Sequence, residues 1–290
     1  MATVTQDKKK HIKGQIQVAL PVEANVPPDN LGESIITIYG RKGIGKTSLA
    51  AQFPGSITCM FERGRRNLPI KQVPQKGEDK LGWDTFKDYV ELFLGSDEYQ
   101  TLVMDTIDRA YDRCLESVCK EKGCKHPNDK NDYGKTWGEI KAEFDALLGV
   151  IQDSGKGLVL ISHEKAKSLG KSVEGMRRED SEDSYEYKRW EPSCSKQAFE
   201  VIEEVCDFVF YYGFESEHRC ITVRSPNDLA WTSCGMDRFL DPDGTPINKF
   251  NVGASEQEAY QNLLRAYNGE LRDLDYVPPR ETPVFKKKEK

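Results

Sequence analysis

The segment that most constrains the fold is ITIYGRKGIGKTS, residues 36–48. A β-prone apolar run stops at Gly40, and Gly45, Lys46 and Thr47 complete the spacing G-x-x-x-x-G-K-[ST] before a helical continuation. Glycines let the backbone curl so that successive N–H groups point at phosphate oxygens, and the start of a helix adds the positive end of its dipole. The spacing therefore predicts a strand, a phosphate-binding loop and a helix, and the alternative is a chance glycine-rich turn.

This loop supplies most of the expected nucleotide contacts. Lys46 would contact the β- and γ-phosphates, and the Thr47 hydroxyl would ligate Mg²⁺. Asp105 ends the apolar run TLVMD, where it would hold Mg²⁺ through water unless it is an ordinary strand-ending residue. No N-K-x-D stretch stands at a strand end, so ATP is expected rather than GTP. The expected nucleotide-binding residues are Gly40, Arg41, Lys42, Gly43, Ile44, Gly45, Lys46, Thr47 and Ser48.

Hydrolysis also requires a group that orients or deprotonates water. A threonine follows Asp105, where one large class of P-loop ATPases has a glutamate, so that class is disfavoured. In RecA-like ATPases the glutamate ends the strand after the P-loop helix. Glu62 stands there behind ITCMF, either as the catalytic group or as a plain surface residue, and Asp108 is the second choice. The segment LVLISHE places Ser162 and His163 at a strand end, as sensors of the γ-phosphate or as packed side chains.

Strand-like and helix-like segments alternate along the chain. Strands are expected at 34–39, 56–62, 100–106, 155–163, 206–212 and 218–225. Helices are expected at 46–53, at 84–94, from after 106 to about 121, and at 137–152, 195–204 and 256–271. Several strands are apolar enough for burial on both faces. This pattern predicts an α/β fold with a mostly parallel twisted sheet flanked by helices and with antiparallel strands near the C-terminal end.

Composition divides the chain into three parts. We expect a flexible N-terminal arm at 1–33, one RecA-like P-loop ATPase domain at 34–270, and a flexible basic tail at 271–290, because prolines and charges dominate both ends. No apolar run approaches the roughly 18 residues of a membrane span, and the N-terminus lacks the apolar part of a secretory signal. A cytoplasmic protein without a membrane partner is expected.

Five segments together resemble a known family: IYGRKGIGKTSLAAQFPG, FERG, LVMDTID, YGKTWGEIKAEF and LISHEK. They are similar to phage-type P-loop ATPases with a RecA-like core, which include Sak-type single-strand annealing and recombination ATPases. The resemblance covers roughly 34–235. It implies that Lys46 and Thr47 bind ATP, that Asp105 is the Mg²⁺ aspartate and that Glu62 is the catalytic glutamate. If the chain is phage-encoded, its site of action would be the host cytoplasm.

The resemblance also implies contact with single-stranded DNA after the sensor strand, within residues 164–191. The basic residues nominated for that contact are Lys165, Lys167, Lys171, Arg177 and Arg178. Tyr185, Tyr187 and Trp190 are available to stack on bases. Eight acidic residues in the same stretch offset the basic ones, and the net charge of the whole chain is −6. The alternative is a solvated flexible loop.

RecA-like ATPases usually hydrolyse ATP when a basic residue of a neighbouring protomer reaches the γ-phosphate. The resemblance therefore implies a homo-oligomer, and Arg224 and Arg238 are candidates for the trans-acting arginine, although each is also typical of a surface position. Replication or recombination proteins are further expected partners.

The cysteines raise the question of a metal site. Cys114, Cys119, Cys124 and His126 have the spacing C-x₄-C-x₄-C-x-H, whereas structural zinc sites use tighter pairs with a longer gap between them. Unligated, reduced cysteines are therefore expected.

Three functions remain open from the residues. The first is an ATP-hydrolysing protein that acts on single-stranded DNA in phage recombination or replication. The second is a non-hydrolysing nucleotide switch or a helicase-loader-like partner. The third is a P-loop small-molecule kinase, for which the mixed charges of 164–191 make a poor phosphate-clamping lid.

Overall fold

The computed structural model describes residues 10–12, 16–18, 30–62, 68–75, 78, 80–171, 186–215 and 217–271. The strands are β1 (Lys10–Ile12), β2 (Ile16–Val18), β3 (Ile35–Gly40), β4 (Ser56–Met60), β5 (Gln72–Val73), β6 (Thr101–Asp105), β7 (Gly157–Lys171), β8 (Glu186–Pro192), β9 (Phe208–Glu215), β10 (His218–Thr222) and β11 (Lys249–Asn251). The helices are α1 (Lys46–Ala50), α2 (Trp83–Leu94), α3 (Ile107–Glu121), α4 (Lys135–Asp153), α5 (Lys196–Val205) and α6 (Glu256–Tyr267), with short 3₁₀ helices at Leu31–Glu33 and Pro127–Lys130.

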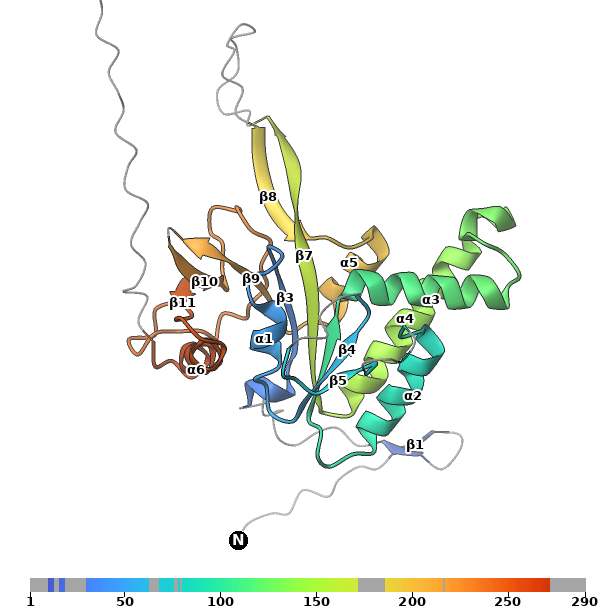
Figure 1. Ribbon diagram of the computed structural model, residues 1–290, viewed down its shortest axis with the longest axis horizontal. Helices are drawn as coiled ribbons and strands as arrows, with labels where there is room; N and C mark the ends of the chain where they lie inside the picture. Colours follow the sequence, from blue (N-terminus) through green and yellow to red (C-terminus); the bar gives the residue numbers. More distant parts are fainter. Residues whose placement is uncertain are drawn as a thin grey trace, which may run out of the picture.

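One large sheet organises the domain, with the strand order β11-β10-β9-β3-β7-β6-β4-β5 (Figure 1). From β9 to β5 every neighbouring pair is parallel, whereas β10 pairs antiparallel with both β9 and β11. The predicted α/β fold, a mostly parallel sheet with antiparallel strands near the C-terminal end, is confirmed. The short strands β5 and β11 escaped prediction because two or three residues carry no periodicity.

Helices cover both faces of this sheet, which explains why the central strands are apolar throughout (Figure 1). Helices α2 to α5 bury one core with the sheet, represented by Phe86, Tyr111, Phe144 and Val201. Helices α1 and α6 bury the other core, and Leu31 is fully buried within it. Within the described ranges, no helix is long and apolar enough to cross a membrane.

Strand β7 departs from the sequence prediction. It was expected to stop at residue 163 and to lead into an irregular loop, but it continues to Lys171 and pairs antiparallel with β8. The hairpin extends the central strand β7 beyond the carboxyl ends of its neighbours and projects from the sheet as an arm (Figure 1). A two-stranded ladder satisfies backbone hydrogen bonds without an apolar face, so the charged composition of 164–169 concealed it. Arg177 and Arg178 lie outside the described residues, as does the side chain of Lys171.

Candidate nucleotide site

The predicted catalytic residues meet at one edge of the sheet, where the parallel strands end. Gly40 of β3 pairs with His163 of β7, and the next strands place Ile161 opposite Asp105 and Asp105 opposite Met60. Glu62 follows β4 by two residues. Four segments far apart in the chain therefore bring the loop, the aspartate, the glutamate and the histidine together, as expected for carboxyl ends of parallel strands.

Gly40 opens the loop at a point where no side chain fits. It pairs with Tyr212 of β9, and a Cβ added to Gly40 would lie 2.0 Å from the carbonyl oxygen of Tyr212. Gly43 and Gly45 have φ angles of 81° and 111°, which L-residues rarely adopt. Arg41, Lys42 and Gly43 are exposed along the loop, Ile44 is buried beneath it, and Ser48 is half-buried in α1.

We expect Gly40→Ala to lower the free energy of unfolding by about 3 kcal/mol, because the new methyl group must push β9 away from β3. Chemical denaturation followed by circular dichroism measures this loss. Gly138→Ala is the matched control, since Gly138 lies inside α4 with open space around its Cα, and it should gain up to about 1 kcal/mol. Equal effects of the two substitutions would contradict the close approach at Gly40.

Lys46 is held in the middle of the loop. Its side chain is buried, and its Nζ donates hydrogen bonds to the carbonyl oxygens of Gly40 at 2.7 Å and of Arg41 at 3.0 Å. An ammonium fixed among carbonyl groups at the start of a helix is ready to exchange those partners for phosphate oxygens.

Thr47 and Asp105 form the second part of the site. The Thr47 hydroxyl donates to Oδ2 of Asp105 at 2.6 Å, and both side chains are buried. A hydroxyl and a carboxylate at this separation are the hard oxygen donors that Mg²⁺ takes, together with phosphate oxygens and water. These residues therefore fit the predicted metal.

Glu62 and His163 form the third part. Oε1 of Glu62 lies 2.9 Å from Nε2 of His163, and the side chains are 18% and 24% exposed. The backbone N–H of Phe61 donates to the carbonyl of Asp105 at 2.7 Å, which fixes the segment carrying Glu62 beside β6. Both predicted residues thus face a partly open edge and contact each other. Nδ1 of His163 is buried and has no hydrogen-bond partner among the described residues.

Ser162 is the alternative to His163 as the sensor, and Asp108 is the alternative to Glu62 as the catalytic carboxylate. The Ser162 side chain is fully buried, and its hydroxyl donates to the carbonyl of His163, which leaves His163 as the sensor candidate. Asp108 lies in the first turn of α3, and its Oδ1 is buried without a hydrogen-bond partner in the described part of the chain. Glu62, rather than Asp108, contacts His163.

The candidate trans-acting arginines are engaged within their own chain. Arg224 donates to four backbone carbonyls, those of Gly235, Arg238, Phe239 and Ile247, at 2.6 to 3.1 Å. It thereby holds the loop that follows β10. The Arg238 guanidinium lies over the ring of Tyr267, 5.2 Å from its centroid. A trans-acting role would require Arg224 to give up these bonds, and the role stays a prediction for both residues.

Lys165 and Lys167, which are predicted to bind DNA, lie where the arm leaves the sheet. Lys165 Nζ donates to the carbonyl of Cys194 at 3.0 Å, and Lys167 Nζ lies 3.2 Å from the carboxylate of Glu191. Both lysine side chains are exposed, so these partners hold them without covering them. DNA contact by these residues stays a prediction.

The cysteine–histidine cluster takes ordinary packing positions. Cys114 and Cys119 are buried in α3, and Cys124 follows its end. Nδ1 of His126 accepts a hydrogen bond from the backbone N–H of Asn128 at 3.2 Å. Across the described residues, no group of three or more His, Cys, Asp or Glu side chains is placed to hold a metal ion.

The parallel sheet, the loop around Lys46 and the Thr47–Asp105 pair define a P-loop nucleotide-binding protein. The chain belongs to the AAA domain family, whose model matches residues 33–233. It is 23% identical over 155 residues to the SPbeta prophage-derived uncharacterized protein YorG of Bacillus subtilis. That match covers 51% of this chain and 46% of YorG, so the chain spans about half the length of this relative. A solved KaiC-like protein from Pyrococcus horikoshii aligns with a TM-score of 0.41 and 13% identity, over 78% of this chain and 88% of that one.

Proposed function

We propose that the protein binds ATP with Mg²⁺ and hydrolyses it to ADP and phosphate. The observation that carries this proposal is the Glu62–His163 contact, which lies on the same sheet edge as Lys46 and the Thr47–Asp105 pair. A P-loop alone supports nucleotide binding, whereas hydrolysis also needs a group that activates water. Glu62 supplies a carboxylate at the place where RecA-like ATPases use one.

Each residue has a separate task in this proposal. Lys46 binds the β- and γ-phosphates, while Thr47 and Asp105 hold Mg²⁺, which neutralises charge on the phosphates when it is bound. Glu62 orients the attacking water and accepts its proton. His163, in contact with Glu62 and at the start of the arm, responds to the γ-phosphate.

We further propose that hydrolysis serves work on single-stranded DNA, in a homo-oligomer that acts with replication or recombination proteins. Strand β7 supports the DNA part, because it runs without a break from His163 into the exposed arm that carries Lys165 and Lys167. An ordered strand can transmit a structural change to the arm from the nucleotide edge, the sheet edge that carries Lys46, Thr47, Asp105, Glu62 and His163. The prophage origin of the relative YorG agrees with a phage setting.

We expect single-stranded DNA to stimulate phosphate release from MgATP, and we expect Lys165→Gln/Lys167→Gln to reduce that stimulation. Phosphate contacts are electrostatic, so the apparent DNA affinity should fall steeply between about 50 and 200 mM salt. Phosphate release measured across a DNA titration at two salt concentrations tests this. Lys120→Gln and Lys130→Gln, two exposed lysines in the last turn of α3 and in the 3₁₀ helix Pro127–Lys130, provide a charge-matched control outside the arm and the phosphate-binding loop. Release that ignores DNA at every salt concentration would contradict the DNA proposal and leave the ATPase proposal intact.

A further inference from the structure

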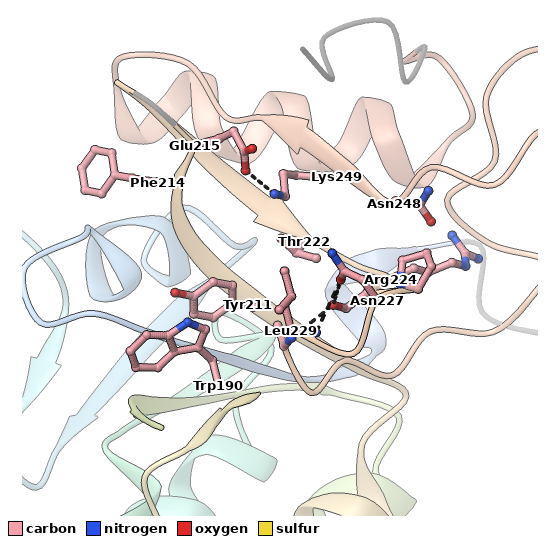
Figure 2. Close-up of a pocket in the computed structure, with 13 residues that line it drawn as sticks. Trp190, Tyr211, Phe214, Glu215, Thr222, Arg224, Asn227, Leu229, Asn248 and Lys249 are labelled. Carbon is pink, nitrogen blue, oxygen red and sulfur yellow. Dashed lines mark hydrogen bonds and ion pairs between the residues drawn. The ribbon is translucent and has the colours of Figure 1, made fainter. Parts of the chain in front are cut away.

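A surface pocket of about 420 Å³ lies where the base of β8 meets β9, β10 and β11 (Figure 2). Its volume lies within the range of small-molecule pockets, about 300–1,000 Å³. Figure 2 shows the rings of Trp190 and Tyr211 along one side of the pocket and the Glu215–Lys249 ion pair on another. The residues proposed to bind ATP and Mg²⁺ or to activate water do not line it, whereas Arg224, a candidate trans-acting arginine, does.

Large apolar side chains are exposed around this pocket. Trp190 is 38% exposed, Phe214 is 53% exposed and Leu229 is 47% exposed, and all three line the pocket. Leaving such side chains in water forgoes the free energy that burial would provide. A group of them around one concave surface is typical of a binding site.

Polar groups complete the lining. Thr222 and Asn248 add a hydroxyl and an amide, and Lys249 adds an ammonium paired with Glu215. A purely apolar occupant, such as an aliphatic side chain of a partner protein, would cover the Thr222 hydroxyl and the Asn248 amide without offering them a hydrogen-bond partner. A flat ring with donors and acceptors along its edge would stack on the aromatic side chains and satisfy the polar ones. An unstacked nucleobase has this chemistry.

The arm also places a cation, Lys188, close to Trp190. In the ladder Trp190 pairs with Ala166 and Lys188 pairs with Ser168. Lys188 precedes Trp190 by two residues in β8, so both side chains lie on the same face of the hairpin, about 7 Å apart along the strand. Lys188 is exposed. A strand of nucleic acid could therefore place a base against Trp190 and a phosphate near Lys188.

We propose that this pocket binds a base of single-stranded DNA and that Trp190 is the stacking residue. This inference rests on the proposed DNA function, and it adds the location of a site that binds one base.

The pocket is also tied to the nucleotide edge. The single Tyr39 hydroxyl proton is shared between the carbonyl oxygens of Trp190 at 3.0 Å and Trp231 at 2.7 Å, and the centroid of its ring lies 5.3 Å from that of the Tyr211 ring. Tyr39 directly precedes Gly40. A base bound in the pocket would therefore contact residues that pack against Tyr39 of β3, the strand that leads into the phosphate-binding loop.

The test compares a thymidine oligonucleotide with an abasic oligonucleotide of the same length, by fluorescence anisotropy in the presence of Mg²⁺ and a non-hydrolysable ATP analogue. Stacking on one aromatic side chain predicts about tenfold tighter binding of the strand with bases. Trp190→Ala should reduce this preference to within about twofold and leave abasic binding unchanged, whereas Trp190→Phe should retain most of it. Tyr133→Ala, which removes a fully exposed aromatic side chain outside the pocket, is the matched control and should retain all of it.

Each other result overturns the inference in a distinct way. If Trp190→Ala keeps the preference for bases, DNA binding stands and the pocket is not the base site. If it weakens both oligonucleotides equally, Trp190 acts through the fold of the arm. If it changes the sedimentation of the protein alone, the pocket is a contact between copies of the chain. If the wild-type protein binds neither oligonucleotide, the DNA proposal fails as well.

Discussion

Replacing Glu62 by glutamine should abolish phosphate release while ATP binding persists. Glutamine has nearly the same shape and can still contact Nε2 of His163, but it cannot accept a proton from water. Loss of a general base lowers a rate by about 10²- to 10⁴-fold, so the variant should release phosphate at no more than about 1% of the wild-type rate. Steady-state phosphate release and calorimetric titration with ATP, both with Mg²⁺, separate turnover from binding.

Asp108→Asn is the matched control for that experiment, because Asp108 is the second candidate for the catalytic carboxylate. It should keep most of the turnover. If Glu62→Gln still hydrolyses ATP and Asp108→Asn does not, the catalytic carboxylate belongs to α3. If both variants remain active, the water is activated by another group, and the RecA-type assignment of Glu62 is wrong.

Replacing Lys46 by alanine should remove nucleotide binding. The ammonium is the buried cation of the loop, and alanine would remove its charge-assisted bonds to the β- and γ-phosphates. We expect about 100-fold weaker ATP binding, which corresponds to roughly 3 kcal/mol. Calorimetric titration with MgATP measures the change.

Lys42→Ala controls for the loss of a positive charge from the same loop, because Lys42 is exposed, and it should bind ATP within a few-fold of the wild type. Lys46 also donates to the carbonyls of Gly40 and Arg41, so thermal unfolding of Lys46→Ala must show that the fold survives. A folded Lys46→Ala protein with wild-type affinity would refute the phosphate-binding loop.

The nucleotide edge was predictable because its signals are local. The glycine spacing around Lys46 requires a strand before it and a helix after it, and both are present. Asp105, Glu62 and His163 each follow a run of apolar residues, and parallel strands bring their carboxyl ends to one edge. Their mutual contacts then follow from strand order rather than from any single motif. The role of Glu62 in turnover stays a prediction until it is measured.

Other features depend on contacts between distant segments, and the sequence carries little trace of them. The arm formed by β7 and β8 has charges on both faces, so neither helical nor strand periodicity marks it. Arg224 looks like a surface arginine in the sequence, yet four carbonyls of a later loop surround it. The pocket combines Trp190 of β8 with Phe214 of β9 and Leu229 of a loop, and only the folded chain brings them together.

The most direct test of the central claim is product analysis of ATP incubated with the wild-type protein, with Mg²⁺ and with excess chelator. The account predicts ADP and free phosphate in equal amounts with Mg²⁺, and neither product with chelator. ATP that stays bound and intact would indicate a nucleotide switch or a kinase without its acceptor, and ADP formed without an equal amount of free phosphate would indicate transfer of the phosphoryl group to the protein itself. Either of these two results would contradict the claim that this sheet edge hydrolyses ATP.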